Sequence, residues 1–297
     1  MDVPVRQIVD RSLRPLSRLL PRNAAVDRVY HALLFCWKHG RLPRRDAKMW
    51  NDMWYRVKTS GEILDPLRVF VTDKEFVKSY VSRKAGDRYV VPTLALLRSA
   101  DEVDEFPFPP DCCIKPTHAS GELVLRKGEQ PVDRQRIKSW FSLNYYLKSR
   151  EPHYLRLVPK VIVEPLIFGS DAVYDYKIFC FEGYPRIIQV DLDRFSNHKR
   201  KFFDTAWNEL DFSIIYPRAA RKIRRPDTLD EMLAVARALS QEFPLVRIDL
   251  YTDNQRVLVG EITHCSDNAG GIFSPRCAEK SASELMFTGA GGNPQSC

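Results

Sequence analysis

Two acidic residues at the ends of apolar runs constrain this chain more than any other feature of its sequence. Asp249 lies in FPLVRIDLYT and Glu261 in RVLVGEIT, and each run is typical of a buried strand. The turn-forming residues 252–255 between them predict a hairpin, which would place the two carboxylates side by side. Burying even one ionised carboxylate is costly unless a cation or hydrogen bonds compensate it. The pair therefore predicts a divalent metal site of the kind that carries a nucleoside triphosphate.

The length and charge of the chain limit its class. With 297 residues and 44% hydrophobic content, it can bury a substantial core as one composite domain or as two to three packed subdomains. Its formal net charge of +8 fits an anionic ligand such as ATP, an acidic polymer, a membrane surface or nucleic acid. Nucleic acid is disfavoured, because no recognisable reading motif accompanies the basic residues.

The cysteines and the first 45 residues bear on the cellular setting. The seven cysteines are odd in number and lack CxxC spacing, so we expect reduced thiols in the cytoplasm. Charged residues interrupt the first twenty positions, which predicts no export. The apolar stretch 29–37 is too short to span a bilayer. The basic segment 1–45 could rest on a membrane surface, but a solvated helix that caps the domain is the simpler interpretation.

The remaining pattern predicts a mixed α+β fold rich in antiparallel strands. A capping box from Thr72 to Glu75 would begin a helix with Lys74 in its first turn. A second capping box, from Thr228 to Glu231, would begin another. A further helix would place Ile137, Trp140, Phe141 and Tyr145 on one side. Strands are expected at 112–114, 122–126, 160–167, 174–181 and 186–191.

Several segments could carry chemistry, and each also has a structural interpretation. The loop from Lys115 to Gly121 combines a lysine with small residues that let backbone amides approach phosphates, although a plain turn has the same composition. Glu164 ends an apolar strand and could contact a ribose or adenine, or form a structural ion pair. The segment 189–201 mixes acids and bases that suit a transferring phosphoryl group, or a solvated loop. A zinc or thiol site at His264 and Cys265 is disfavoured, because no second Cys/His cluster has ligand spacing.

The order of these features is more specific than any one of them. From about residue 45 to residue 280 the chain resembles the ATP-grasp family of the teichuronopeptide-biosynthesis type, also called TupA-like. The blocks that carry the resemblance are Thr72–Lys74, Lys115–Gly121, Val163–Glu164, Asp175–Phe181, Gln189–Arg200, Val246–Tyr251 and Gly260–Thr263. Members of this family are often labelled glycosyltransferases of polysaccharide gene clusters, but their fold suggests amide ligation.

The resemblance implies a nucleotide held between two α+β subdomains, with a helical N-terminal region. Lys74 and Lys115 would contact phosphates. The remaining nucleotide-binding residues would be His118, Ser120 and Gly121 of the lid loop, Glu164, Pro165, Leu166 and Ile167 of the adenosine site, and Lys177. Asp249, Glu261 and Thr263 would bind Mg2+. Thr263 stands where the family usually has an asparagine ligand, so Asn268 could complete the site. The catalytic candidates are Arg194, His198, Lys199 and Arg200.

The domain boundaries expected from this resemblance are a basic helical extension at 1–45, a helical region at 46–110, a lid subdomain at 111–170, a subdomain with the metal site at 171–282 and a tail at 283–297. The implied activity is an ATP- and Mg2+-dependent carboxylate-amine ligase that proceeds through an acyl phosphate. Its substrates would be an acidic sugar or amino-acid unit of a surface polysaccharide and an amine. Two alternatives stay open: a glycosyltransferase using Asp191-Leu-Asp193 as its metal motif, and a non-catalytic nucleotide-binding protein.

Overall fold

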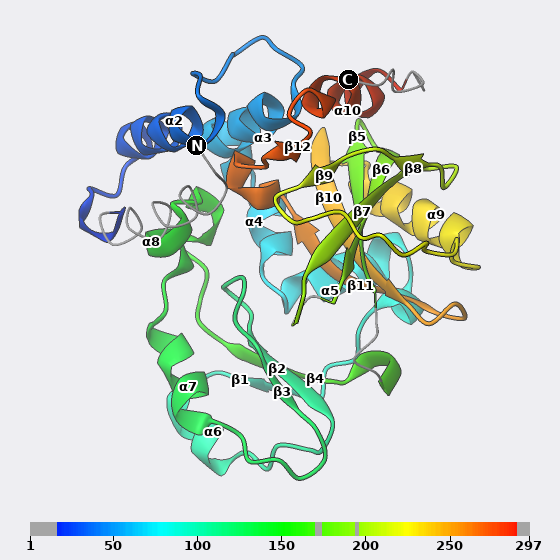
Figure 1. Cartoon of the computed structure of the whole chain (residues 1–297). Helices are drawn as coiled ribbons and strands as arrows, with labels where there is room; N and C mark the ends of the chain where they lie inside the picture. The colour runs from blue at the N-terminus through cyan, green and yellow to red at the C-terminus, as the bar shows by residue number, and fades with distance from the viewer. Residues whose placement is uncertain (1–16, 170–173, 194–195, 290–297) are drawn as a thin grey trace.

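A six-stranded antiparallel sheet forms the larger half of the molecule (Figure 1). The computed structural model describes residues 17–169, 174–193 and 196–289. In sheet order the strands are β11 (Val257–Thr263), β10 (Leu245–Thr252), β5 (Asp175–Phe181), β6 (Tyr184–Leu192), β7 (Lys199–Asp204) and β8 (Glu209–Leu210). A short pair, β9 (Ser213–Ile214) with β12 (Phe273–Ser274), lies beside it.

Each face of this sheet packs on helices because apolar residues alternate along its strands. Ile178 and Ile248 point to one face and join a core with the helices α9 (Leu229–Ser240) and α5 (Phe76–Lys84). Phe179 points to the other face and joins a core with α3 (Trp50–Thr59) and α10 (Ala278–Thr288). The sheet is therefore the centre of a three-layer arrangement.

A smaller antiparallel sheet lies at the opposite end of the molecule (Figure 1). Its strands, in sheet order, are β1 (Ala95–Leu97), β4 (Val161–Pro165), β2 (Cys112–Pro116) and β3 (Val124–Arg126). The helices α6 (Ala100–Glu105) and α7 (Arg134–Ser139) cover it, and their Val103 and Ile137 share a core with Ile114 and Val163.

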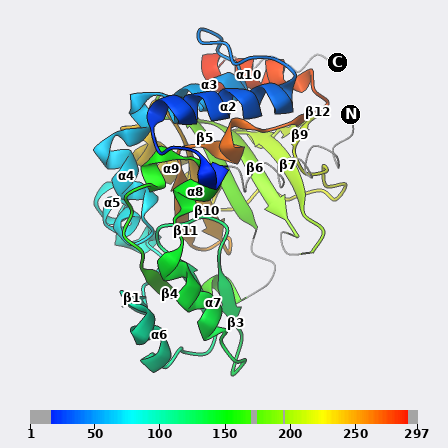
Figure 2. The same cartoon turned by 90° about the vertical axis from the view of Figure 1, so that its left-hand side faces the viewer.

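Helices and short 3-10 turns surround the two sheets. Figure 2 shows α2 (Ala24–His39) lying alongside α3 across the top of the molecule. Asn23 caps α2 by accepting a hydrogen bond from the Val26 amide, and Gly40 ends it in the left-handed conformation. The other helices are α4 (Pro66–Thr72) and α8 (Tyr145–Ser149). The 3-10 turns are η1 (Gly61–Leu64), η2 (Asp87–Tyr89), η3 (Trp140–Ser142), η4 (Pro152–Tyr154), η5 (Ile167–Gly169) and η6 (Ser266–Ala269).

The structure confirms the α+β class and the acidic hairpin but corrects three local predictions. The capping box at Thr72 is wrong: the Thr72 hydroxyl donates to the Arg68 carbonyl at the end of α4, and Lys74 lies between α4 and α5. Thr228 precedes α9 as predicted, but its hydroxyl bonds to Thr252 and not to the helix. The helix expected through Ile137 and Tyr145 is interrupted after η3.

Of the cysteines that the structure describes, five are free thiols, whereas Cys277 is disulfide-bonded. The expectation of reduced cysteines therefore does not extend to Cys277. None of the described helices is both long and apolar enough to cross a membrane.

Candidate functional site

One face of the six-stranded sheet carries a row of charged and polar side chains. From β11 to β6 the row consists of Glu261, Asp249, Lys177 and Gln189, each the register partner of the next. Register partners point to the same face, so these side chains lie next to one another. Farther along the strands the same face is apolar, and Phe179 packs against the α3 core there. The face is therefore divided into an apolar half under α3 and α10 and a polar half beyond them.

Asp249 is buried and fully engaged by protein cations. Arg247 approaches it with two parallel contacts, Nε to Oδ1 at 2.7 Å and Nη2 to Oδ2 at 2.8 Å. Lys177 Nζ lies 3.0 Å from Oδ2. Burial alone would raise the pKa of Asp249, but Arg247 and Lys177 outweigh it and hold that pKa below its ordinary value. Asp249 is therefore ionised and already balanced by positive charge.

Glu261 is in a different situation. It is half-buried, and no residue in the described parts of the chain forms an ion pair with it. Its charge nevertheless influences the pKa values of two lysines. Burial lowers the pKa of Lys74, and among its neighbours Glu261 opposes this most strongly. Burial would lower the pKa of Lys115, but Glu164, Cys113 and Glu261 together raise it above its ordinary value. The two predicted phosphate-contacting lysines and one predicted metal ligand thus share one electrostatic environment.

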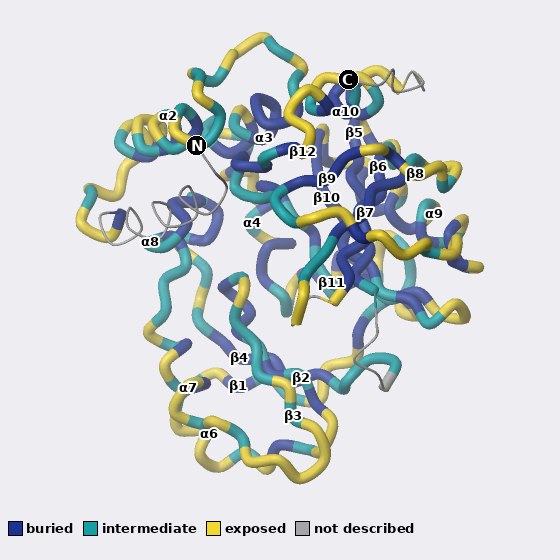
Figure 3. Tube along the Cα trace, viewed as in Figure 1, coloured by how far each residue is buried: buried dark blue, intermediate teal, exposed yellow. Residues whose placement is uncertain are grey.

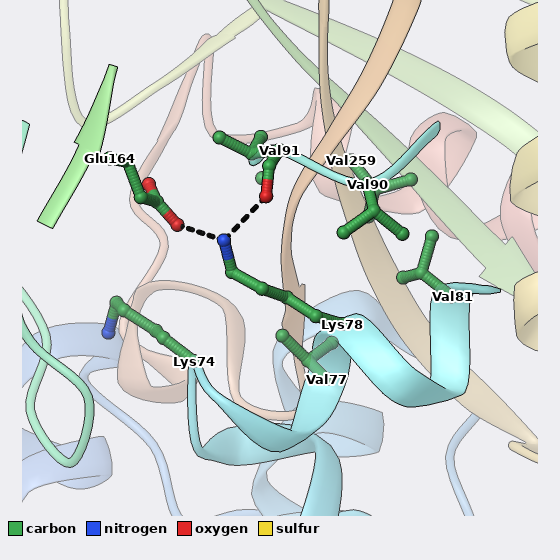
Figure 4. Close-up of a pocket in the computed structure, with 9 residues that line it drawn as sticks. Lys74, Val77, Lys78, Val81, Val90, Val91, Glu164 and Val259 are labelled. Atoms are coloured by element: carbon green, nitrogen blue, oxygen red, sulfur yellow. Dashed lines mark hydrogen bonds and ion pairs between the residues drawn. The ribbon is translucent and has the colours of Figure 1, made fainter. Parts of the chain in front are cut away.

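A small pocket lies between α5, β4 and β11, where the two sheets approach each other (Figure 4). Glu164 lies at its polar end, with Lys78 Nζ 2.6 Å from Oε1 and Lys115 Nζ 2.6 Å from Oε2. These two lysines outweigh burial and hold the pKa of Glu164 below its ordinary value. The rest of the lining is mostly valine: Val77, Val81, Val90, Val91 and Val259. The pocket therefore combines an apolar wall with a charged rim.

The loop after β2 is anchored at one end and open at the other. His118 is buried, and its Nε2 lies 3.1 Å from the carbonyl oxygens of both Trp140 and Leu143, so it ties the loop to η3. Burial lowers its pKa. The Ala119 carbonyl accepts a hydrogen bond from Lys74 Nζ at 2.6 Å. Ser120 is half-buried, and Gly121 is exposed with φ +81° and free space around it. Lys74 and His118 therefore hold the start of the loop, and Gly121 lies in open space beyond them.

The predicted adenosine segment continues from Glu164 along the end of β4. Pro165 is the register partner of Cys112, and the Leu166 amide donates to the Asp111 carbonyl at 2.8 Å. Ile167 begins η5 and is half-buried. The amide of Leu166 is thus already used within the small sheet.

A second charged group extends the row towards β7. Asp191 accepts hydrogen bonds from Arg200 Nε at 2.7 Å and Gln189 Nε2 at 2.9 Å, and His198 Nε2 lies 3.2 Å away. Burial would raise the pKa of Asp191, but the neighbouring His198, Arg200 and Lys177 hold it well below its ordinary value. Arg200 also donates to the Ile214 carbonyl, so it ties β7 to β9.

The other predicted catalytic residues are placed differently. Lys199 precedes Arg200 in β7, and the strand pleat turns it to the opposite face. Arg194 lies outside the described residues. Asp193 of the DxD pattern is exposed, 3.6 Å from Arg221, whereas Asp191 is buried against Arg200. These two aspartates therefore have separate partners.

Thr263 and Asn268 occupy different surroundings. The Thr263 hydroxyl accepts a hydrogen bond from Arg247 Nη2 at 3.1 Å, which keeps it in the polar row. The Asn268 side chain instead contacts Lys58 and the Ser149 carbonyl. The structure thus brings Thr263, and not Asn268, beside Asp249.

Two residues of the site were not expected from the sequence. Arg247 precedes Asp249 by two positions on the same strand face, and this i, i+2 spacing could have identified it. Lys78 lies one helical turn beyond Lys74, on the α5 face that carries Val77 and Val81. The four-residue spacing from Lys74 to Lys78 is visible in the sequence. The ion-pair partner of Lys78 is not, because Glu164 comes from a strand more than eighty residues away.

Comparisons with known proteins give one family. A family model described as TupA-like ATPgrasp matches residues 54–285. Among solved structures, a D-alanine–D-alanine ligase from Bacillus anthracis is 16% identical over 73% of this chain and 67% of its own, with a TM-score of 0.39. A D-alanine–D-alanine ligase from Helicobacter pylori is 16% identical over 74% and 61%, with a TM-score of 0.40. An L-amino acid ligase from Bacillus licheniformis is 11% identical over 73% and 49%, with a TM-score of 0.42. No protein of curated function matches the sequence.

Proposed function

Since the chain belongs to the TupA-like ATP-grasp family, we propose that it is an ATP- and Mg2+-dependent ligase that joins a carboxylate to an amine. The observation that carries the proposal is the register pairing of Asp249 with Glu261 beside two lysines, Lys74 and Lys115. Paired carboxylates are suitable oxygen ligands for Mg2+, and lysines pair with phosphate charge.

The donor set fits the ion. Glu261 forms no ion pair with the part of the chain that the structure describes, and Asp249 is ionised, so with the Thr263 hydroxyl they would offer oxygen ligands on one sheet face. When bound, Mg2+ would neutralise the charge of the nucleotide phosphates. Lys74 and Lys115 would bind the same phosphates from the side of the small sheet.

The nucleotide would lie where the two sheets meet. The valine-lined pocket would take the adenine ring, with Glu164 at its edge. The backbone of Pro165, Leu166 and Ile167, which follows Glu164 in the chain, would contact the same nucleoside. Lys78 would add positive charge there. The loop through His118, Ser120 and Gly121 would act as the lid. We also propose that residues 111–170 form the lid subdomain, that 171–282 form the subdomain with the metal ligands, and that 46–110 precede them.

The reaction would proceed in two steps, through an acyl phosphate. A carboxylate oxygen attacks the γ-phosphorus of ATP, the bond to the β,γ-bridging oxygen breaks, and ADP leaves. The amine nitrogen then attacks the acyl carbon, the phosphate leaves with the bonding electrons, and the nitrogen loses a proton. Lys177, His198, Arg200 and Arg194 would orient the carboxylate and balance charge as the phosphate develops.

The carboxylate substrate is proposed to be an acidic sugar or amino-acid unit of a surface polysaccharide. Purified protein is incubated with ATP, Mg2+, pooled uronic acids and amino acids, and ADP release is measured. We expect release that requires both a carboxylate and an amine, with a product whose mass equals both substrates minus water. Glu261→Gln should abolish release, whereas Asp253→Asn, an acid in the turn of the same hairpin, should not.

The other outcomes of this assay separate the alternatives. Turnover of a nucleotide sugar without ATP would contradict the ligase and indicate a glycosyltransferase. ATP binding without turnover in every mixture would indicate a non-catalytic nucleotide-binding protein.

We further propose that α2 and its flanks rest on an anionic membrane surface. Residues 17–45 contain seven lysines and arginines against one aspartate. The outer face of α2 exposes Val29, Leu33 and Trp37 at i, i+4 and i+8, and Figure 3 shows this helix at the periphery. A basic, apolar helix face of this kind binds anionic lipid.

Sedimentation with vesicles tests the membrane proposal. The protein should sediment with phosphatidylglycerol vesicles and not with phosphatidylcholine vesicles. Leu33→Asp should abolish this binding, while Val158→Asp should not, because both side chains are 66% exposed but Val158 lies outside residues 17–45. Equal binding by the two variants would contradict the assignment.

A further inference from the structure

A buried cluster of titratable side chains lies between α3, α4, η4 and the segment after β11, and the proposed reaction does not use it. We call it the inner cluster; its members are Lys58, Arg68, Glu151, His153, His264 and Cys265. They come from four separate stretches of the chain. Burying so many ionisable groups together is costly unless each finds a partner.

Three members of the inner cluster offer metal-ligand atoms at short range. One ligand atom each of Glu151, His153 and Cys265 lies within 4.8 Å of the other two, and all three residues are buried. In a tetrahedral zinc site with bonds of about 2.0–2.3 Å, ligand atoms are about 3.3–3.8 Å apart. Small side-chain rotations would close this difference of about 1 Å.

One ring nitrogen of His153 has no hydrogen-bond partner among the described residues. Its Nδ1 is buried with none, and its Nε2 lies 3.5 Å from Glu151 Oε2, which is beyond a normal hydrogen bond. Buried polar atoms are normally paired, so the orphaned nitrogen calls for a ligand.

We propose that Glu151, His153 and Cys265 bind a zinc ion that fixes the segment after β11 to η4. A sulfur and a nitrogen ligand favour zinc over Mg2+, which prefers oxygen. The carboxylate and the thiolate supply two negative charges, which balance the ion, while the imidazole is neutral. Binding releases the thiol proton, so the ion together with its three ligands is neutral beside Lys58 and Arg68.

The neighbouring side chains limit the ligand set to three residues. Arg68 Nη1 donates to His264 Nδ1 at 3.0 Å, so the proton of the neutral His264 ring stays on Nε2 and blocks that nitrogen as a ligand. Lys58 contacts the Asn268 side chain, and Glu151 is the neighbour that most favours its charged form. A structural ion pair between Lys58 and Glu151 is therefore the competing explanation, and it requires no metal.

Metal content distinguishes the two explanations without any measurement of activity. The protein is purified without chelators, and zinc is measured by mass spectrometry of the ashed sample. We expect one zinc per chain. After chelation, Co2+ should restore the stoichiometry and give a thiolate-to-cobalt charge-transfer band, and zinc should raise the melting temperature of the apo-protein.

Matched variants locate the site. Cys265→Ser should lose the cobalt band and the zinc-dependent rise in melting temperature, and His153→Gln should lose stoichiometric binding. Cys36→Ser, a half-buried cysteine on α2, and Glu261→Gln should keep all three signals. Metal-free wild-type protein that takes up no stoichiometric Co2+ would overturn the proposal. So would a Cys265→Ser variant that binds as much metal as the wild type. Failure of the ligase assay would leave these results unaffected.

Discussion

The two acids of the hairpin should respond differently to removal of their charge. Asp249→Asn keeps the side-chain volume but removes the partner of Arg247 and one partner of Lys177. Lys177 retains Asp175, whereas Arg247 retains only neutral hydroxyl partners, on Ser266 and Thr263. Glu261→Gln removes a half-buried carboxylate that forms no ion pair with the described residues.

These contacts set the size of the expected effects. Breaking a buried ion pair by removing one partner costs about 3–5 kcal/mol. Because Arg247 loses its direct ion-pair partner but keeps the electrostatic influence of Asp267 and Glu261, we expect the lower end, about 3 kcal/mol, for Asp249→Asn. Substitutions that break no such ion pair usually change the free energy of unfolding by no more than about 0.5 kcal/mol, and we expect a change of this size for Glu261→Gln. Both variants should lose ATP turnover, because each removes a proposed metal ligand.

Urea unfolding followed by circular dichroism measures the first effect, and ADP release measures the second. The midpoint of Asp249→Asn should fall well below that of the wild type, while Glu261→Gln should unfold with the wild type. An Asp249→Asn protein as stable as the wild type would refute the charge compensation by Arg247 and Lys177. A Glu261→Gln protein with normal ADP release would refute the metal assignment.

Three further variants test other parts of the structure. Lys78→Met removes a pocket cation and should raise the KM for ATP about tenfold, equivalent to roughly 1.4 kcal/mol; an unchanged KM would exclude Lys78 from the nucleotide site. Burial lowers the pKa of His39 to about 4 from 6.5, so the unfolded chain binds a proton between these values that the folded chain does not. Stability should therefore fall as the pH drops from 6.5 to 4, by roughly 3 kcal/mol at most, and urea midpoints of His39→Gln should show a shallower slope. Phe179→Ala empties the core beneath Trp50 and should cost about 3–5 kcal/mol in urea unfolding, and a loss below 1 kcal/mol would contradict its burial.

The parts of the site that could be predicted from the sequence are those fixed by local pattern. Alternating apolar residues around Asp249 and Glu261, with turn residues between them, predict the hairpin, but the pairing of the two acids also depends on a register shift between Asp249 and Leu250 that the pattern does not mark. The capping-box pattern failed at Thr72 because the same residue types also end helices. The Thr72 hydroxyl donates a hydrogen bond to the Arg68 carbonyl, and the Asp73 carboxylate accepts a hydrogen bond from the Glu75 amide.

Contacts between distant segments could not be predicted in this way. Glu164 gains Lys78 and Lys115 only when the small sheet meets α5. The inner cluster brings Glu151 and His153 to Cys265 across more than a hundred residues, so no ligand spacing marks it in the sequence. Such pairs depend on how the two sheets are placed relative to each other, which no local periodicity encodes.

The compensation of Asp249 changes what the acidic pair implies. Two buried acids would demand a metal if nothing else balanced them, but Arg247 and Lys177 already balance Asp249. The cost of burial therefore does not by itself require an ion. The case for Mg2+ and a nucleotide rests on Glu261, whose carboxylate lacks such a partner among the described residues and acts on Lys74 and Lys115 across the pocket. An ion bound by both acids would have to share Asp249 with Arg247, whose guanidinium keeps this proposed metal ligand ionised.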